Sequence, residues 1–399
     1  MYLEDIGFLT AENGIWTLDP EGKRYVTDHS TETLLEIMCR RNVGLRSLLY
    51  VLSVGPMTVE QIGRQQLETH HELGWNPENP DMALKRVNWL RIPCVPEIST
   101  VPALTRSCVV SSVLKDQIVV LTGGTSGIGR IAARELAEQG ATVAVIGRDQ
   151  TCGERLTAES TSVPGEIRFH RTDLATQAAV RALAADIRET YDRIDALVHN
   201  AGLSVPTRTE TADGIELTLA VNHLAPYLLT HELLDMVTAA APSRVVVTAS
   251  DVHRRATLNF DDLQFTADYD PLQAYARSKL ATIAFTFELA DRLSETSQVT
   301  ANCFHPGFIP STNLFRDASV WTRVMVRMAA LIPGIGTTQQ DGAQRLLQLV
   351  TDPQFGERSG TYVTEDGITS PSTEASDPAT RKRLWGVSAE LVGIDADWP

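Results

Sequence analysis

A glycine-rich turn at residues 122–130, TGGTSGIGR, narrows the range of folds open to this chain more than any other segment. It follows the apolar run QIVVL and begins the helical pattern GIGRIAARELAEQG. Glycines in such a turn let the backbone approach a pyrophosphate, which then binds at the helix N-terminus. The turn therefore predicts a dinucleotide site, although three spaced glycines (Gly123, Gly127 and Gly129) also suit an ordinary strand-to-helix connection.

The sequence after residue 114 alternates apolar runs with helical patterns. The runs typical of β-strands span residues 117–124, 141–147, 166–173, 195–202 and 243–250. The helical patterns between them span residues 129–140, 177–191 and 216–237. This alternation predicts an α/β fold, a Rossmann-like doubly wound parallel sheet with helices on both faces. Ligands of such sheets bind outside the carboxyl ends of the strands, so the residues that follow each run are the candidates for chemistry.

A tyrosine and a lysine, Tyr275 and Lys279, lie one helical turn apart in the segment AYARSKLATIAFTF. On a helix they project from one face. A phenol with a pKa near 10 is too weak an acid for proton transfer at neutral pH, whereas a neighbouring ammonium and a cationic nicotinamide would lower that pKa. A pair of exposed surface residues is the alternative, but the glycine turn upstream favours the catalytic interpretation.

The glycine turn followed by Tyr-x-x-x-Lys resembles the signature of the short-chain dehydrogenase/reductase family, over about residues 112–399. The resemblance implies a catalytic set of Asn222, Ser250, Tyr275 and Lys279. Both Ser250 and Asn222 also have a structural alternative. A serine at the end of a strand is usually a helix cap, and an asparagine in an apolar helix usually needs a structural hydrogen-bond partner. The implied cofactor-binding residues are Gly123, Thr125, Ser126, Gly127, Ile128, Gly129, Arg148, Asp173, Leu174, Asn200, Ala201, Gly202, Tyr275, Lys279, Pro306, Gly307 and Ser311. No metal site is implied.

The end of the second strand indicates the choice of cofactor. An NAD enzyme needs a carboxylate there, whereas an arginine accommodates the 2′-phosphate of NADP. The family register places Gly147 in the acidic position and Arg148 after it, which favours NADP(H) over NAD. Asp149 would favour NAD if the register shifted by one residue, and Arg130 is either a further positive charge or a solvated residue. Asp173 suits the adenine edge, a helix N-cap, or both.

The C-terminal part resembles the retinol dehydrogenase-like branch of the family, through segments such as VNHLAPYLLT, FDDLQ and RLWGVSAEL. This implies interconversion of an aldehyde or ketone with an alcohol. Residues 312–334 follow the Pro-Gly segment where this branch has a substrate flap, and their apolar side chains indicate either a lid over a lipophilic substrate or core packing. A sugar-nucleotide epimerase of the extended branch is disfavoured, because its glycine spacing usually differs.

The first part of the chain has a different organisation. Residues 7–26 predict a β-hairpin that turns at Asn13-Gly14, and the helical patterns that follow resemble a winged-helix module. We expect this module over residues 1–91, a proline-containing linker over 92–112 and the dehydrogenase domain over 113–399. The alternative function is an NAD(P)-sensing regulator that binds DNA through the module, with a catalytically idle Rossmann domain. Residues 1–110 hold ten basic and fourteen acidic residues, which disfavours a nucleic-acid partner.

The overall composition excludes several other classes. The net charge of −15 disfavours nonspecific contact with nucleic acid or an anionic membrane. The cysteines have no C-x-x-C spacing, which argues against a zinc site or a disulfide framework. The N-terminus lacks the features of a signal peptide and no long apolar run occurs, so we expect a cytoplasmic protein without a membrane span. A homo-oligomer is compatible with the sequence, and the scarcity of lysine suggests the hypothesis of a salty cytoplasm.

Overall fold

The computed structural model describes residues 9–12, 15–18, 114–293, 297–309 and 337–399. The chain divides into two units, Met1–Val113 and Leu114–Pro399, and each is described by itself. In the first unit β1 (Leu9–Glu12) pairs antiparallel with β2 (Ile15–Leu18), as expected for a hairpin around residues 13–14. The rest of the expected winged-helix module and linker lies outside the described residues.

An eight-stranded sheet organises the second unit, in the order β10-β9-β8-β7-β6-β3-β4-β5. All neighbouring pairs are parallel except the antiparallel pair of β9 and β10. The strands are β3 (Ile118–Thr122), β4 (Thr142–Gly147), β5 (Glu166–Arg171), β6 (Ala196–His199), β7 (Ser243–Thr248), β8 (Val299–Phe304), β9 (Tyr362–Thr364) and β10 (Gly367–Thr369). The expected doubly wound parallel sheet is confirmed.

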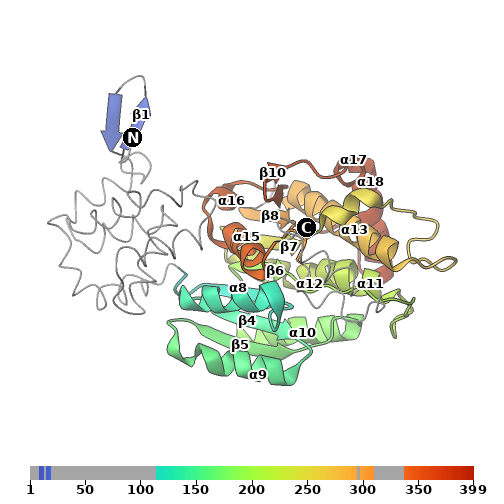
Figure 1. Ribbon diagram of the computed structural model, residues 1–399, viewed down its shortest axis with the longest axis horizontal. Helices are drawn as coiled ribbons and strands as arrows, with labels where there is room; N and C mark the ends of the chain where they lie inside the picture. Colours follow the sequence, from blue (N-terminus) through green and yellow to red (C-terminus); the bar gives the residue numbers. More distant parts are fainter. Residues whose placement is uncertain (1–8, 13–14, 19–113, 294–296, 310–336) are drawn as a thin grey trace, which may run out of the picture. The chain divides into compact units, whose positions relative to one another are not determined.

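Helices cover both faces of this sheet (Figure 1). One face packs against α8 (Gly127–Glu138), α9 (Gln150–Glu159) and α15 (Gln339–Thr351). The other packs against α10 (Gln177–Thr190), α12 (Ala225–Ala239), α13 (Pro271–Leu293) and α18 (Pro378–Val392). Shorter elements are η3 (Ser160–Ser162), α11 (Leu217–Leu219), η4 (Ala220–Leu224), η5 (Asp251–Arg255), α16 (Gln354–Glu357) and α17 (Thr373–Ser376).

The apolar strands explain why the sheet is buried on both sides. In β3 the side chain of Val120 packs in one core, while Val119 and Leu121 pack in the other. Such continuous apolar runs are typical of parallel strands, which have helices on each face. Two aromatic side chains, Trp385 of α18 and Phe285 of α13, stack with ring centroids 5.9 Å apart and close one core at its edge.

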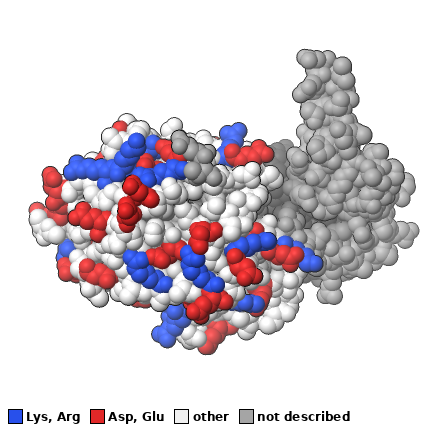
Figure 2. Space-filling model, turned by 180° about the vertical axis from the view of Figure 1, so that it is seen from behind, with Lys and Arg blue, Asp and Glu red and all other residues white. Residues whose placement is uncertain are grey.

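The order of the strands also fixes where a ligand binds. The chain runs outward from β3 to β4 and β5, and then returns to place β6 on the other side of β3. The connections after β3 and β6 therefore diverge at the carboxyl edge and leave a crevice there. On the face of the molecule in Figure 2, basic and acidic side chains are interspersed and do not form a single basic patch.

Candidate active site

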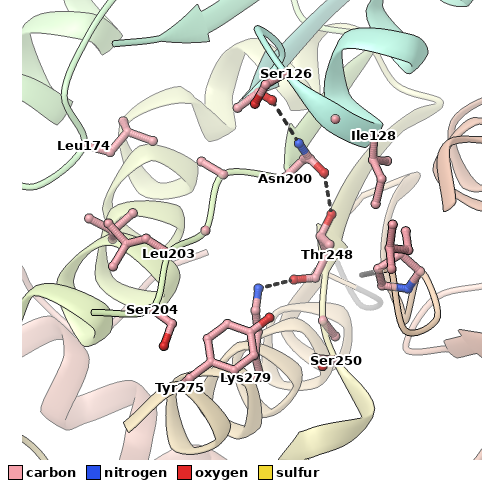
Figure 3. A pocket seen from close by; sticks show the side chains of 18 of the residues that line it. Ser126, Ile128, Leu174, Asn200, Leu203, Ser204, Thr248, Ser250, Tyr275 and Lys279 are labelled. Atoms are coloured by element: carbon pink, nitrogen blue, oxygen red, sulfur yellow. Dashed lines mark hydrogen bonds between the residues drawn. The ribbon is translucent and has the colours of Figure 1, made fainter. Parts of the chain in front are cut away.

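A cavity of about 1200 Å³ opens at the carboxyl edge of the sheet. It brings together most of the residues predicted from the sequence (Figure 3). Among the predicted site residues that the structure describes, only Gly129 and Asn222 do not line it. Ser311 and the expected flap lie outside the described residues. A volume of this size accommodates a ligand larger than a typical drug-sized molecule.

The glycine turn begins α8 and leaves its first backbone N–H groups available for an anion. Gly123 and Gly127 have φ angles of +68° and +54°, which are costly for residues with a Cβ atom. A Cβ atom on Gly129 would lie 2.3 Å from the carbonyl oxygen of Gly123, so the close approach of helix and turn requires glycine there. Ser126 occupies the N-cap position but its side chain makes no capping hydrogen bond. The helix N-terminus is therefore free to bind a phosphate.

Asn200 holds the glycine turn against the neighbouring strands. Its side-chain amide donates to the carbonyl oxygens of Thr122 and Gly123, at 3.3 and 3.2 Å. Its side-chain oxygen accepts a hydrogen bond of 3.3 Å from the Thr248 hydroxyl, at the end of β7 (Figure 3). The residue fixes the relative position of the cofactor turn and the catalytic strand. His199 before it points into the core, where its Nε2 lies 2.8 Å from the Thr230 hydroxyl.

The three principal catalytic candidates meet at one end of the cavity. Tyr275 and Lys279 project from α13, and Ser250 follows β7 (Figure 3). The Lys279 ammonium donates a 2.7 Å hydrogen bond to the carbonyl oxygen of Thr248 and lies 5.8 Å from the centroid of the Tyr275 ring. The helical spacing therefore places the phenol and the ammonium together, as predicted.

Burial shifts the pKa values of both Tyr275 and Lys279. Burial raises the pKa of Tyr275 to about 12, and the Ser250 hydroxyl opposes this shift only in part. Burial also lowers the pKa of Lys279 to about 8, because the charged ammonium is removed from water. At neutral pH the Tyr275 phenol is therefore protonated. The lowering of this pKa by the ammonium together with a cationic nicotinamide stays a prediction for the enzyme with its cofactor bound.

Asn222 has structural partners. It lies in η4, a π-helical turn between α11 and α12, and its side chain accepts from the N–H of Leu203 at 2.8 Å. Its amide donates to the Leu203 carbonyl and to the Ser278 hydroxyl, both at 2.9 Å. Its backbone carbonyl accepts a hydrogen bond from the Thr282 hydroxyl at 3.0 Å. The side chain thus anchors the loop after β6, beside Lys279, rather than lining the cavity.

The residues at the end of β4 lie where the adenosine part of a dinucleotide would bind. A Cβ atom on Gly147 would lie 2.7 Å from the Thr125 side chain, so a carboxylate at this position would require Thr125 to move. Asp149 caps α9 by accepting from the N–H of Cys152 at 2.9 Å. Arg148 lines the cavity, and no other described residue forms a hydrogen bond or ion pair with it. Arg130, in contrast, is paired with Glu159 at 2.8 Å.

One alternative for Asp173 is corrected by the structure. Thr176, not Asp173, is the N-cap of α10, and its hydroxyl accepts from the N–H of Ala179 at 3.3 Å. Asp173 instead accepts from the N–H of Ala175 at 3.2 Å and lines the cavity beside Leu174. The structure is therefore compatible with Asp173 at the adenine edge of the cofactor, but Asp173 is not the N-cap of α10.

Sequence reasoning missed several residues that position the site. Arg345 of α15 donates a 2.6 Å hydrogen bond to the Pro306 carbonyl and so holds the Pro-Gly segment. His305 accepts from the N–H of Asp251 at 3.3 Å, and burial lowers its pKa to about 4, so that it stays neutral. The exposed Leu272 and Phe308 also line the cavity, and Leu272 lies one helical turn before Tyr275 in α13. The contacts of Arg345 and His305 join residues distant in sequence, so no local pattern indicates them.

Within the described ranges, no group of His, Cys, Asp and Glu side chains is arranged to hold a metal ion. In the same ranges, no helix has the length and hydropathy needed to span a membrane.

Comparison with known proteins decides the family. The family model for short chain dehydrogenases matches residues 117–322, which contain the glycine turn, Ser250, Tyr275 and Lys279. This protein belongs to the short-chain dehydrogenase family. Its curated relatives place it in the retinol dehydrogenase-like branch. As a member of this family it is an oxidoreductase that interconverts carbonyl and alcohol groups with a nicotinamide dinucleotide.

The relatives of this short-chain dehydrogenase include human retinol dehydrogenase 14, which is 35% identical over 69% of this chain and 86% of its own. Human dehydrogenase/reductase SDR family member 13 is 38% identical over 70% of this chain and 74% of its own. Among solved structures, an uncharacterised protein from Mycobacterium paratuberculosis has a TM-score of 0.58, 29% identity, and coverage of 71% of this chain and 96% of that one. The NADP complex of RhlG from Pseudomonas aeruginosa has a TM-score of 0.52, 25% identity, and coverage of 64% and 96%.

Proposed function

We propose that this short-chain dehydrogenase uses NADP(H) and acts on a lipophilic aldehyde, ketone or alcohol through Ser250, Tyr275 and Lys279, with Asn222 as a positioning residue. The observation that supports this most directly is the convergence of the three side chains at one end of a cavity whose other end presents Arg148. A pure nucleotide sensor would not need a buried lysine beside a tyrosine. The apolar residues beside Tyr275 support the choice of a lipophilic substrate.

The fit of the dinucleotide rests on the turn and on the two ends of the cavity. The N–H groups at the start of α8 would hold the pyrophosphate, and Lys279 would hold the nicotinamide ribose. When bound, the nicotinamide ring supplies or accepts the hydride. Arg148 would pair with a 2′-phosphate, since no described residue pairs with its guanidinium and Asp149 is engaged in capping α9. The NADP complex of RhlG and the NADPH complex of a dehydrogenase from Escherichia coli are consistent with this choice.

The chemistry assigned to the side chains follows from their protonation. The Ser250 hydroxyl donates a hydrogen bond to the carbonyl oxygen of the substrate, and this polarises the carbon. The neutral Tyr275 phenol donates its proton to the same oxygen as negative charge develops there. The ammonium of Lys279 stabilises the phenolate that remains, because opposite charges at this distance interact strongly in a buried site. In the oxidation direction the phenolate accepts the proton of the alcohol.

The decisive experiment is the Tyr275→Phe variant, assayed with NADPH against a panel of lipophilic aldehydes and ketones. Removing the hydroxyl should lower kcat by at least about a hundredfold, the usual contribution of a general acid. The affinity for NADPH, measured by fluorescence titration, should remain close to that of the wild type. Turnover retained at the wild-type rate would exclude the proposed mechanism.

The Arg148→Ala variant tests the choice of cofactor. Loss of the guanidinium should raise the KM for NADPH about tenfold, since charged hydrogen bonds contribute about 1.5–3 kcal/mol, and should leave the KM for NADH unchanged. Arg155→Ala, which removes an exposed arginine of α9 that pairs with Glu159, is the matched control. Equal effects on both cofactors would argue for a general role of Arg148 in folding.

A further inference from the structure

The substrate side of the cavity combines apolar walls with the side chain of Arg255, which has no ion-pair partner among the described residues. Beyond Ser250 and Tyr275 the cavity is lined by the apolar side chains of Leu203, Val205, Leu217, Val252, Leu272 and Phe308. The side chain of Arg255 lines the same cavity. Leu272 and Phe308 remain 50% and 40% exposed, so apolar surface is available for a ligand to cover.

Arg255 differs from the arginine next to it. Arg254 donates to a carboxylate oxygen of Asp251 at 2.8 Å and to the Ser370 carbonyl at 2.7 Å. Asp251 also lines the cavity, but its charge is compensated by this pair. No hydrogen bond or ion pair to Arg255 occurs within the part of the chain that the structure describes. Among the described residues, the guanidinium of Arg255 is therefore left without a compensating carboxylate.

The cofactor would not use this charge. Its pyrophosphate belongs at the turn before α8, and its 2′-phosphate belongs at Arg148 after β4. Arg255 ends η5, the short helix that follows β7 and begins immediately after Ser250. In the order of the strands β7 lies on the opposite side of β3 from β4, and hence at the other end of the crevice. A ligand that reaches both Ser250 and Arg255 is the substrate.

We infer that the preferred substrate is a lipophilic carbonyl compound with a carboxylate or another anionic group at the end remote from the reacting carbon. The inference rests on the proposed function and adds the charge of the substrate to it. Arg255 lies five positions after Ser250, at the end of a tightly wound helical turn. At a rise of about 2 Å per residue, the backbone positions of the two residues are roughly 10 Å apart along the turn, so the anion would bind away from the reacting carbonyl. The guanidinium of Arg255 would bind a carboxylate in a bidentate manner.

A matched set of aldehydes tests this inference. The probes are ω-oxodecanoate, its methyl ester and decanal, which share an aldehyde and an apolar chain and differ in charge at the far end. The wild type should show a kcat/KM for ω-oxodecanoate about fivefold above that for the ester, equivalent to about 1 kcal/mol, the upper range for an exposed ion pair. The preference should weaken as salt is added, because ions screen an exposed pair.

Three variants assign the preference to one side chain. Arg255→Gln should bring the ratio of acid to ester to about one, and should leave the kcat/KM for decanal unchanged. Arg255→Lys should retain part of the preference, because the charge remains. Arg134→Gln removes the same charge from an exposed position of α8, where Arg134 pairs with Glu138, and should leave the ratio as in the wild type. The same ratio in the wild type and Arg255→Gln would overturn the inference.

A binding measurement keeps this test separate from that of the proposed function. Titration calorimetry with ω-hydroxydecanoate and its methyl ester, in the presence of NADPH, measures the preference for the anion without turnover, because an alcohol and the reduced cofactor cannot react with each other. If none of the aldehydes is reduced but the acid binds about fivefold more tightly than the ester, and this depends on Arg255, then the proposed function fails and the anion site stands. If decanal is reduced and the acid has no advantage in either assay, the proposed function stands and the inference is wrong.

Discussion

The ammonium group of Lys279 lies out of contact with bulk water, with its residue 3% exposed. Its hydrogen bond to the Thr248 carbonyl replaces only part of the hydration that the ammonium loses on burial. The hydration that is not replaced lowers the pKa of Lys279. A group that titrates near pH 8 changes its charge within the range in which enzymes are usually assayed. Carbonyl reduction by the proposed mechanism needs this group charged, because it stabilises the phenolate of Tyr275.

The rate of carbonyl reduction should therefore fall as the pH rises past the pKa of Lys279. Below about pH 8 Lys279 is an ammonium, and above it the proportion of the charged form falls. The kcat/KM for NADPH, which reports ionisations of the free enzyme, should be constant below this pH and decline above it. Steady-state kinetics across this range would measure the effect.

The Lys279→Arg variant provides the control for this profile. A guanidinium keeps its proton far above this pH, so the decline near pH 8 should disappear even if the absolute activity is lower. A decline that begins only near the ordinary pKa of lysine, about 10.5, would contradict the effect of burial on Lys279.

At the scale of elements, the connection between α11 and α12 contains a local departure from helical geometry. The π-helical turn η4 places Asn222 inward, where it binds both backbone groups of Leu203 and the hydroxyl of Ser278. Turns of this kind often occur at functional sites. Here the turn joins the loop after β6 to α13, and hence the cofactor side to the catalytic helix.

Asn222→Ala should lower the free energy of unfolding by about 1–3 kcal/mol, because it leaves the backbone groups of Leu203 without partners. Chemical denaturation would measure the loss. Asn259→Ala is the control, since Asn259 is exposed and accepts a single hydrogen bond from the N–H of Asp261 at 3.2 Å. Equal stability of the two variants would show that the loop after β6 does not depend on Asn222.

At the scale of the whole molecule, the dehydrogenase fold is contained in the unit Leu114–Pro399. Its first residue, Leu114, is buried and its N–H donates to the Gln139 carbonyl at 3.0 Å, so the fold includes this end of the unit. The sheet, the cavity and all the described catalytic candidates lie within this unit.

A shortened chain of residues 113–399 should therefore fold by itself and reduce the same aldehydes with a kcat close to that of the full chain. Circular dichroism and the NADPH assay would measure folding and activity. A folded but inactive shortened chain would show that residues 1–112 contribute to the site. An unfolded one would place the domain boundary further upstream.

Much of this architecture is predictable from local patterns. The five apolar runs correspond to β3, β4, β5, β6 and β7, because parallel strands buried on both faces have continuous apolar sequences. The helical spacing of Tyr275 and Lys279 likewise predicts their proximity. Such features depend on residues close in sequence, so the sequence alone contains the information.

Other parts depend on contacts across the fold. The π-helical turn at Asn222 follows from hydrogen bonds to Leu203 and Ser278, which are distant in sequence. The raised pKa of Tyr275 depends on how much of the protein surrounds the phenol, and spacing does not reveal it. Arg254 and Arg255 are adjacent and chemically identical, and only the fold shows that Arg254 has a carboxylate partner while Arg255 has none among the residues described.

The division of the cavity between two kinds of residue affects how this enzyme could acquire new substrates. The groups that hold the cofactor and transfer the proton lie at strand ends and on long helices, where neighbouring packing constrains them. Several residues on the substrate side, such as Val205, Leu272 and Phe308, lie in connections or at a helix start and are at least partly exposed. Replacing such residues costs little stability. Libraries restricted to these positions should therefore yield altered specificity while most members remain folded and retain the chemical step.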